Sequence, residues 1–173
     1  MRIGFSVFTL PETETAPRSA VVTLLLTGVG RIAVSYRLGK WNDAAAPTQP
    51  LSLSELAGAV AGFGQQPVYG WEFVDPPEER WDHWRERLSL DVDWAQDGRS
   101  HVIDPGQEDW SWEKERILDV RVCFDELTVI DADDEEIPVP LFIERSRQWW
   151  SAFSAGDPRT QGHGMHPLRA DGV

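Results

Sequence analysis

The stretch "AVVTLLLTGVGRIAVSYRL", residues 20–38, contains two apolar runs separated by residues 27–30, TGVG. Glycine can take the positive φ angles that a tight turn needs, so this arrangement predicts a β-hairpin. In the second run every other residue is apolar or aromatic: Ile32, Val34, Tyr36 and Leu38. A period of two is typical of a half-buried antiparallel strand.

Two later segments alternate in the same way, residues 88–94 and residues 118–124. A shift of one residue in any of these strands would turn Asp or Arg toward the core, so the alternation also predicts which face is buried. The core expected under the sheet consists of Ile32, Val34, Leu90, Val92, Val120 and Val122. The alternate residues, such as Asp119 and Arg121, are then expected on the polar face.

Two helices are expected between these strands. Residues 50–64 contain Ser52 and Glu55 at the spacing of a capping box. Residues 74–88 begin with prolines and acids that suit the first turn of a helix. The apolar stripe of this second helix contains Trp81, Trp84 and Leu88. Trp94, on the following strand, is also expected to face inward.

A third helix is expected over residues 140–153, where Phe142, Trp149 and Phe153 recur at helical spacing. Neighbouring helical residues point about 100° apart, so Trp149 and Trp150 cannot both face the sheet. We expect Trp149 to be the more buried of the two, and its truncation to alanine to cost about 3–5 kcal/mol.

The elements do not alternate regularly enough for a parallel, doubly wound sheet. The expected fold class is therefore α+β, a mainly antiparallel sheet with two or three helices packed on it. Residues 1–156 are expected to form this single domain. Residues 157–173 are rich in glycine and have no periodic apolar face, which predicts a flexible C-terminal tail that can be removed at little cost.

The charge of the chain narrows the class of partner. Asp and Glu number 29 against 16 Lys and Arg, for a formal net charge of -13. Such a charge repels phosphate backbones and anionic lipid, so neither nucleic acid nor a membrane is expected as a partner. The same charge favours a basic protein partner. The sequence contains no cofactor motif, so no cofactor is expected. The pattern does not indicate the oligomeric state.

The single cysteine, Cys123, cannot form a disulfide within the chain, which is typical of a reducing compartment. No apolar run approaches the roughly 20 residues of a membrane span, and the apolar start before Pro11 is too short for a signal peptide. We therefore expect a cytoplasmic protein. The excess of arginine over lysine is typical of a GC-rich bacterial genome.

An acidic run, "DADDEE" at residues 131–136, has two interpretations. It lies between two short apolar runs, so it is expected to be the exposed turn of a hairpin. A calcium loop of the EF-hand type would need glycine at its sixth position and glutamate at its twelfth. Counted from Asp131, those positions hold Glu136 and Phe142, so no metal site is expected.

The candidate catalytic residues lie in "DVDWAQDGRSHVID", residues 91–104. A turn at Asp97-Gly98 would pair two strands there and bring together the weak catalytic candidates Asp91, Asp93, His101 and Asp104. Such a cluster could serve a metal-assisted hydrolase. The alternative is structural, because neighbouring strands carry arginines that could pair with Asp91 and Asp93: Arg31, Arg37, Arg99 and Arg121.

Binding residues are sought in "EDWSW", residues 108–112, where Trp110 and Trp112 lie beside Glu108 and Asp109. Exposed tryptophan next to carboxylates is typical of a protein-binding surface. The leading hypothesis is therefore a non-catalytic, acidic binding module, comparable in composition to immunity or adaptor proteins, for a basic partner. The alternatives are the metal-assisted hydrolase and a small-molecule or glycan-binding domain.

Overall fold

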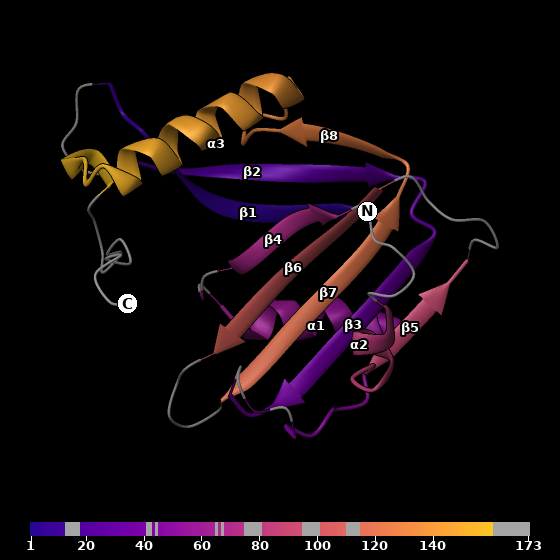
Figure 1. Cartoon of the computed structure of the whole chain (residues 1–173). Helices are drawn as coiled ribbons and strands as arrows, with labels where there is room; N and C mark the ends of the chain where they lie inside the picture. Colours follow the sequence, from indigo (N-terminus) through magenta and orange to yellow (C-terminus); the bar gives the residue numbers. More distant parts are fainter. Residues whose placement is uncertain are drawn as a thin grey trace. The chain divides into compact units, whose positions relative to one another are not determined.

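The computed structural model describes residues 1–12, 18–40, 43, 45–64, 66, 68–74, 81–94, 101–109 and 115–160 (Figure 1). The chain divides into two compact units. Met1–Leu26 and Leu127–Val173 form the first, which we call the four-stranded unit; Thr27–Glu126 form the second, the five-stranded unit. The second is thus inserted between two strands of the first. The α+β class with mainly antiparallel sheet is confirmed, but the expected single sheet is wrong, because there are two.

The four-stranded unit has the strand order β1-β2-β8-β9. Its strands are β1 (Arg2–Thr9), β2 (Arg18–Thr27), β8 (Glu126–Ile130) and β9 (Glu136–Ile137). The helix α3 (Val139–Ser154) and a 3-10 turn, η2 (Pro158–Thr160), follow. β1 runs antiparallel to β2, with Phe5 opposite Val22 and Ile3 opposite Leu24. The buried residues of this unit include Val22, Leu24, Leu26, Val129 and Ile130.

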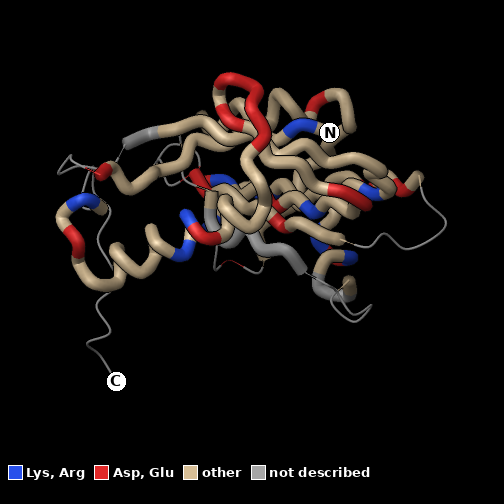
Figure 2. The backbone as a smooth tube through the Cα atoms, turned by 90° about the horizontal axis from the view of Figure 1, so that it is seen from above, with Lys and Arg blue, Asp and Glu red and all other residues tan. Residues whose placement is uncertain are grey.

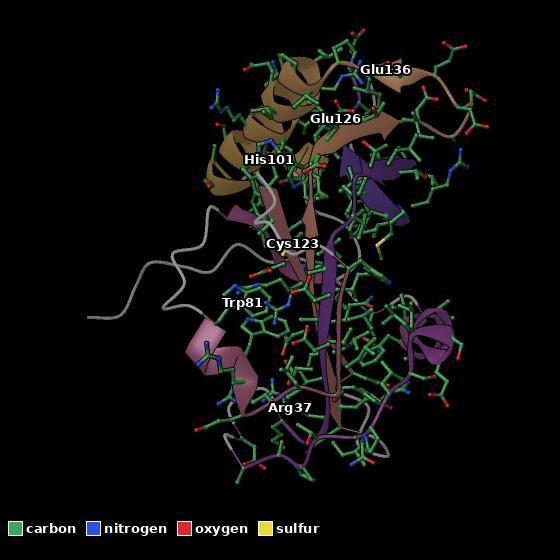
Figure 3. The ribbon with its side chains drawn as sticks, turned by 90° about the vertical axis from the view of Figure 1, so that its right-hand side faces the viewer. Arg37, Trp81, His101, Cys123, Glu126 and Glu136 are labelled. Atoms are coloured by element: carbon green, nitrogen blue, oxygen red, sulfur yellow. The ribbon has the colours of Figure 1, made fainter. Side chains whose placement is uncertain are left out.

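The five-stranded unit has the strand order β4-β6-β7-β3-β5. Its strands are β3 (Arg31–Leu38), β4 (Val68–Val74), β5 (Leu90–Asp93), β6 (His101–Asp109) and β7 (Arg116–Phe124). Two helices, α1 (Leu53–Gly62) and the four-residue α2 (Asp82–Arg85), lie on opposite faces of this sheet (Figure 3). The sheet is therefore the middle layer of three.

The face of this sheet on the α1 side is the predicted core. Ile32, Val34, Val120 and Val122 are all buried there, whereas Leu90 and Val92 on the edge strand are half-buried. The opposite face, expected to be polar, is covered as well: Arg121 is only 3% exposed. The alternation thus identified the two faces correctly, but it did not reveal that α2 covers the polar one.

The hairpin expected within residues 20–38 is wrong. β2 and β3 belong to different sheets, and the residues between them carry the chain from one sheet to the other. Gly28 does take a positive φ of 60°, and a Cβ at that position would meet the side chain of Asp125. The backbone N–H of Asp125 donates to the Thr27 carbonyl at 3.1 Å. The two segments that connect the sheets, one after β2 and one before β8, are therefore joined by a hydrogen bond between Asp125 and Thr27.

Helix α1 begins as its capping pattern predicted. The backbone N–H of Ser52 donates to Glu55 Oε2 at 2.9 Å, and the Ser52 hydroxyl donates to the same oxygen at 2.6 Å. These hydrogen bonds lower the pKa of the Glu55 carboxyl, the hydroxyl contributing most. The second expected helix is shorter than predicted, and residues 75–80 lie outside the described part. Trp94, expected to face inward, is 55% exposed.

Helix α3 confirms the predicted difference between its two tryptophans. The Trp149 ring stacks on Phe8 of β1 with ring centroids 5.9 Å apart, whereas Trp150 is 60% exposed. No described residue of α3 is fully buried, however, so the cost expected from sequence for Trp149→Ala was too large. Among the described residues, no helix is both long and apolar enough to cross a membrane.

We now expect Trp149→Ala to lower the free energy of unfolding by about 1–3 kcal/mol, because it removes the stacked pair and a half-buried apolar surface. Trp150→Ala is the matched control and is expected to cost less than about 1 kcal/mol, as most exposed substitutions do. Urea denaturation followed by far-ultraviolet circular dichroism measures both. Equal losses would show that Trp149 does not anchor the helix.

The tail predicted from residue 157 is wrong in its first four residues. Thr160 is fully buried, its hydroxyl donates to the Asp157 carbonyl at 2.8 Å, and Arg159 donates to the carbonyl of Pro11 at 3.3 Å. Residues 157–160 are thus part of the four-stranded unit. Residues 161–173 lie outside the described part.

Candidate functional site

The acidic run forms the turn that its sequence predicted. Residues 131–136, which we call the acidic hairpin, connect β8 to β9, with Val129 opposite Ile137. Asp131 organises the turn: its Oδ1 accepts hydrogen bonds from the backbone N–H groups of Asp133 at 2.9 Å and Glu135 at 3.0 Å. Asp134 takes a positive φ of 61°. The Asp131 carboxylate is therefore engaged in holding the loop, as expected for an Asp-initiated turn.

The other four carboxylates of the hairpin point away from the protein. Asp133, Asp134, Glu135 and Glu136 are all exposed, and none of them pairs with a cation of the described residues. In Figure 2 the hairpin is a projecting loop that is largely red, and Figure 3 shows Glu136 at its base. Four like charges on a short loop make a concentrated negative potential.

The four catalytic candidates do not meet. Asp91 and Asp93 lie on β5, whereas His101 and Asp104 lie on β6, and two strands separate β5 from β6. Three strand spacings put the two pairs about 14 Å apart. The predicted pairing of these strands across Asp97-Gly98 is thus wrong, although residues 95–100 themselves lie outside the described part.

Three of the four candidates, Asp91, Asp104 and His101, each contact a side chain on a neighbouring strand. Both oxygens of Asp91 accept from Arg31, at 2.8 and 2.7 Å, and both oxygens of Asp104 accept from Arg121. His101 lies opposite Phe124 and its ring is 5.7 Å from the phenyl ring, on the other face of the sheet from Asp104. In the described part of the chain, no three His, Cys, Asp or Glu side chains are grouped so that they could hold a metal ion.

The predicted binding residues are only partly described. Trp110 and Trp112 lie outside the described residues. Glu108 is half-buried, and Asp109 is buried. Asp109 accepts from Arg116 Nε at 3.0 Å and from its Nη2 at 2.9 Å. In this structure Asp109 therefore holds β6 to β7 and does not present its carboxylate to a partner.

A layer of arginine and tryptophan under α2 was missed by sequence reasoning. The guanidinium of Arg31 lies 3.8 Å from the centroid of the Trp81 ring. That of Arg121 lies 4.8 Å from the Trp81 ring and 5.0 Å from the Trp84 ring. Each arginine also binds an aspartate: the Arg31–Asp91 pair is the structural alternative that the sequence offered for Asp91, and the Arg121–Asp104 pair was not anticipated. Two features of the sequence could have indicated this layer. Arg31 and Arg121 occupy the polar face of their alternating strands, and Trp81 and Trp84 are three residues apart, which puts them on one side of a helix.

Cys123 lies at the edge of this layer and is half-buried. Burial raises the pKa of its thiol, and the nearby charges of Arg31 and Arg121 only partly offset that effect. A raised pKa favours the neutral thiol, which is a poor nucleophile.

Comparisons of this chain with protein-family models, with curated proteins and with solved structures found no match.

Proposed function

We propose that this protein is a binding module that docks a basic protein partner through the acidic hairpin. The observation that carries the proposal is the set of four exposed carboxylates on that loop, at Asp133, Asp134, Glu135 and Glu136. The net charge of -13 adds a long-range attraction for a cationic surface. Complementary charge of this kind accelerates association and selects among partners.

The geometry of the loop supports this role. Its backbone is held by Asp131 through two hydrogen bonds, so the four carboxylates are presented on a defined turn. A preorganised loop loses less conformational entropy when it binds than a flexible one does. The ordering cost of the interface is thereby reduced.

The test is a pull-down from native lysate with the tagged full chain, at low and at high salt. We expect a basic partner to be captured at low salt and released at high salt, because exposed charge pairs are screened by ions. The hairpin variant carries Asp133→Asn, Asp134→Asn, Glu135→Gln and Glu136→Gln. Asp131 is kept because it holds the turn, and asparagine tolerates the positive φ at position 134.

The matched control removes four exposed carboxylates elsewhere, with Glu12→Gln, Glu86→Gln, Glu115→Gln and Glu144→Gln, so that both variants lose the same charge. We expect the hairpin variant to bind the captured partner at least about tenfold more weakly, and the control to bind nearly as the parent does. Equal weakening in both would show that net charge alone attracts the partner. The proposal would also be refuted if the amount of captured partner did not depend on salt, or if no partner were captured.

A further inference from the structure

Three polar side chains on the α2 face of the five-stranded sheet have buried groups without a hydrogen-bond partner. Ser35, Arg37 and Arg121 are each no more than 3% exposed. The unmatched atoms are Ser35 Oγ, Arg37 Nε and Nη1, and Arg121 Nη1, none of which bonds to a residue of the described part. Buried polar groups are seldom left unmatched in proteins, and charged donors least of all.

The strand register brings these three side chains together. On β3, Ser35 and Arg37 are two residues apart and share one face of the sheet. On β7, Arg121 lies opposite Ala33, which places it diagonally next to Ser35. Neighbouring positions on one face of a sheet are about 5–8 Å apart. The three residues are therefore neighbours on one face of the sheet, and Figure 3 shows Arg37 on the same side of the sheet as Trp81.

Each guanidinium uses only part of its hydrogen-bonding capacity on an aspartate. Arg37 donates through Nη2 to Asp119 Oδ2 at 2.9 Å, which leaves its Nε and Nη1 donors unmatched. Arg121 uses Nε and Nη2 on Asp104, which leaves Nη1. The remaining donors belong to two cations, and their complement is a group with several anionic oxygens.

The surroundings favour an added anion. Burial raises the pKa of the Asp119 carboxyl, and the positive charges of Arg37 and Arg87 oppose that rise. Arg87 is thus a third cation near the same position. The Trp81 and Trp84 rings against Arg121 hold its guanidinium in place.

We propose that Ser35, Arg37 and Arg121 form a buried site for a small oxyanion, the chemistry shared by a phosphate and a carboxylate group. The guanidinium edges supply charged N–H donors, and the Ser35 hydroxyl supplies a neutral one. The site lies in the five-stranded unit, whereas the acidic hairpin lies in the four-stranded one. The proposal therefore does not depend on the proposed function.

The test is thermal unfolding of the full chain in sodium phosphate, sulfate or acetate, with chloride as reference and the ionic strength held constant. Calorimetric titration gives the dissociation constant and the stoichiometry. At ten times that constant we expect the unfolding midpoint to rise by about 3–6 °C, with one anion bound per chain. A larger shift with phosphate and sulfate than with acetate would identify a tetrahedral ligand, and the reverse a carboxylate. No shift with any of the three would overturn the proposal.

Two variants locate the site. Arg37→Lys keeps a cation near Asp119 but removes the unmatched Nε and Nη1 donors, and Ser35→Ala removes only the hydroxyl oxygen. Both are expected to reduce the anion-dependent shift by at least half. Arg159→Lys, which changes the same group at an exposed position, is expected to leave it intact. If Arg37→Lys does not fold, Ser35→Ala carries the test, and an undiminished shift in that variant would place the anion elsewhere and refute the site.

Discussion

Replacing Arg121 with methionine is expected to lower the free energy of unfolding by about 3–5 kcal/mol, because it leaves the Asp104 carboxylate without its counter-charge in a covered layer. Arg121 is 3% exposed and binds both oxygens of Asp104, whose side chain is 22% exposed, so the contrast with the control below lies mainly in the burial of the arginine. Methionine retains much of the apolar volume beneath Trp81 and Trp84, so the loss reports mainly on charge and hydrogen bonding. Urea denaturation followed by circular dichroism measures it.

Arg31→Met is the matched control for this prediction. Arg31 also holds an aspartate through two hydrogen bonds and also stacks on Trp81. Its side chain is 28% exposed, however, and that of Asp91 is 30% exposed. Exposed ion pairs contribute little, so we expect a loss below about 1 kcal/mol.

A double substitution tests whether the stability lost in Arg121→Met comes from leaving the Asp104 charge unpaired. Arg121→Met combined with Asp104→Leu removes both charges, and such replacements are often close to neutral. We therefore expect the double variant to be more stable than Arg121→Met alone. Equal losses for Arg121→Met and Arg31→Met, or no recovery in the double variant, would show that the covered layer is not a low-dielectric environment.

Replacing Phe124 with alanine is expected to cost about 3–5 kcal/mol, the range for truncation of a buried aromatic residue. Phe124 ends β7, is 1% exposed and has the largest fully buried side chain among the described residues. Its removal creates a cavity that the surrounding strands can fill only in part. The same urea experiment measures the loss.

Trp94→Ala is the control for Phe124→Ala. It removes a larger aromatic side chain from the same unit, but that side chain is 55% exposed. If burial determines the cost, this substitution lowers stability by less than about 1 kcal/mol. A loss that followed the size of the side chain rather than its burial would contradict the assignment of the core.

Three strands, β3, β5 and β7, and the start of α1 were predictable because their signals are local. Alternation with a period of two predicted β3, β5 and β7, and it placed Val34 and Val122 on the buried face. The capping pattern of Ser52 and Glu55 predicted the start of α1, and the acidic run predicted a turn. Each of these features depends on residues within a few positions of one another.

The candidate site was predicted less well. Asp91 and Asp104 were noticed for their carboxylates, yet both are bound by arginines on other strands. Whether a carboxylate serves chemistry or structure depends on the side chain that lies opposite, and strand order determines that. The acidic hairpin was correctly predicted as a turn, because no distant residue takes part in its hydrogen bonds.

The amino-acid sequence by itself therefore determined β3, β5, β7, α1 and α3, and which side of β3 and β7 is apolar, but it did not indicate β1 or β4. The partners of those strands were settled by the tertiary structure. β2 and β3 follow each other in the chain but lie in different sheets, and β5 pairs with β3 rather than with β6. The cover over Arg121 comes from Trp81 and Trp84, far from it in sequence. Periodicity specifies which face of a strand a residue lies on. Which strands pair, and which side chains cover a face, depend on the free energy of packing between residues distant in sequence, and no local pattern contains that information.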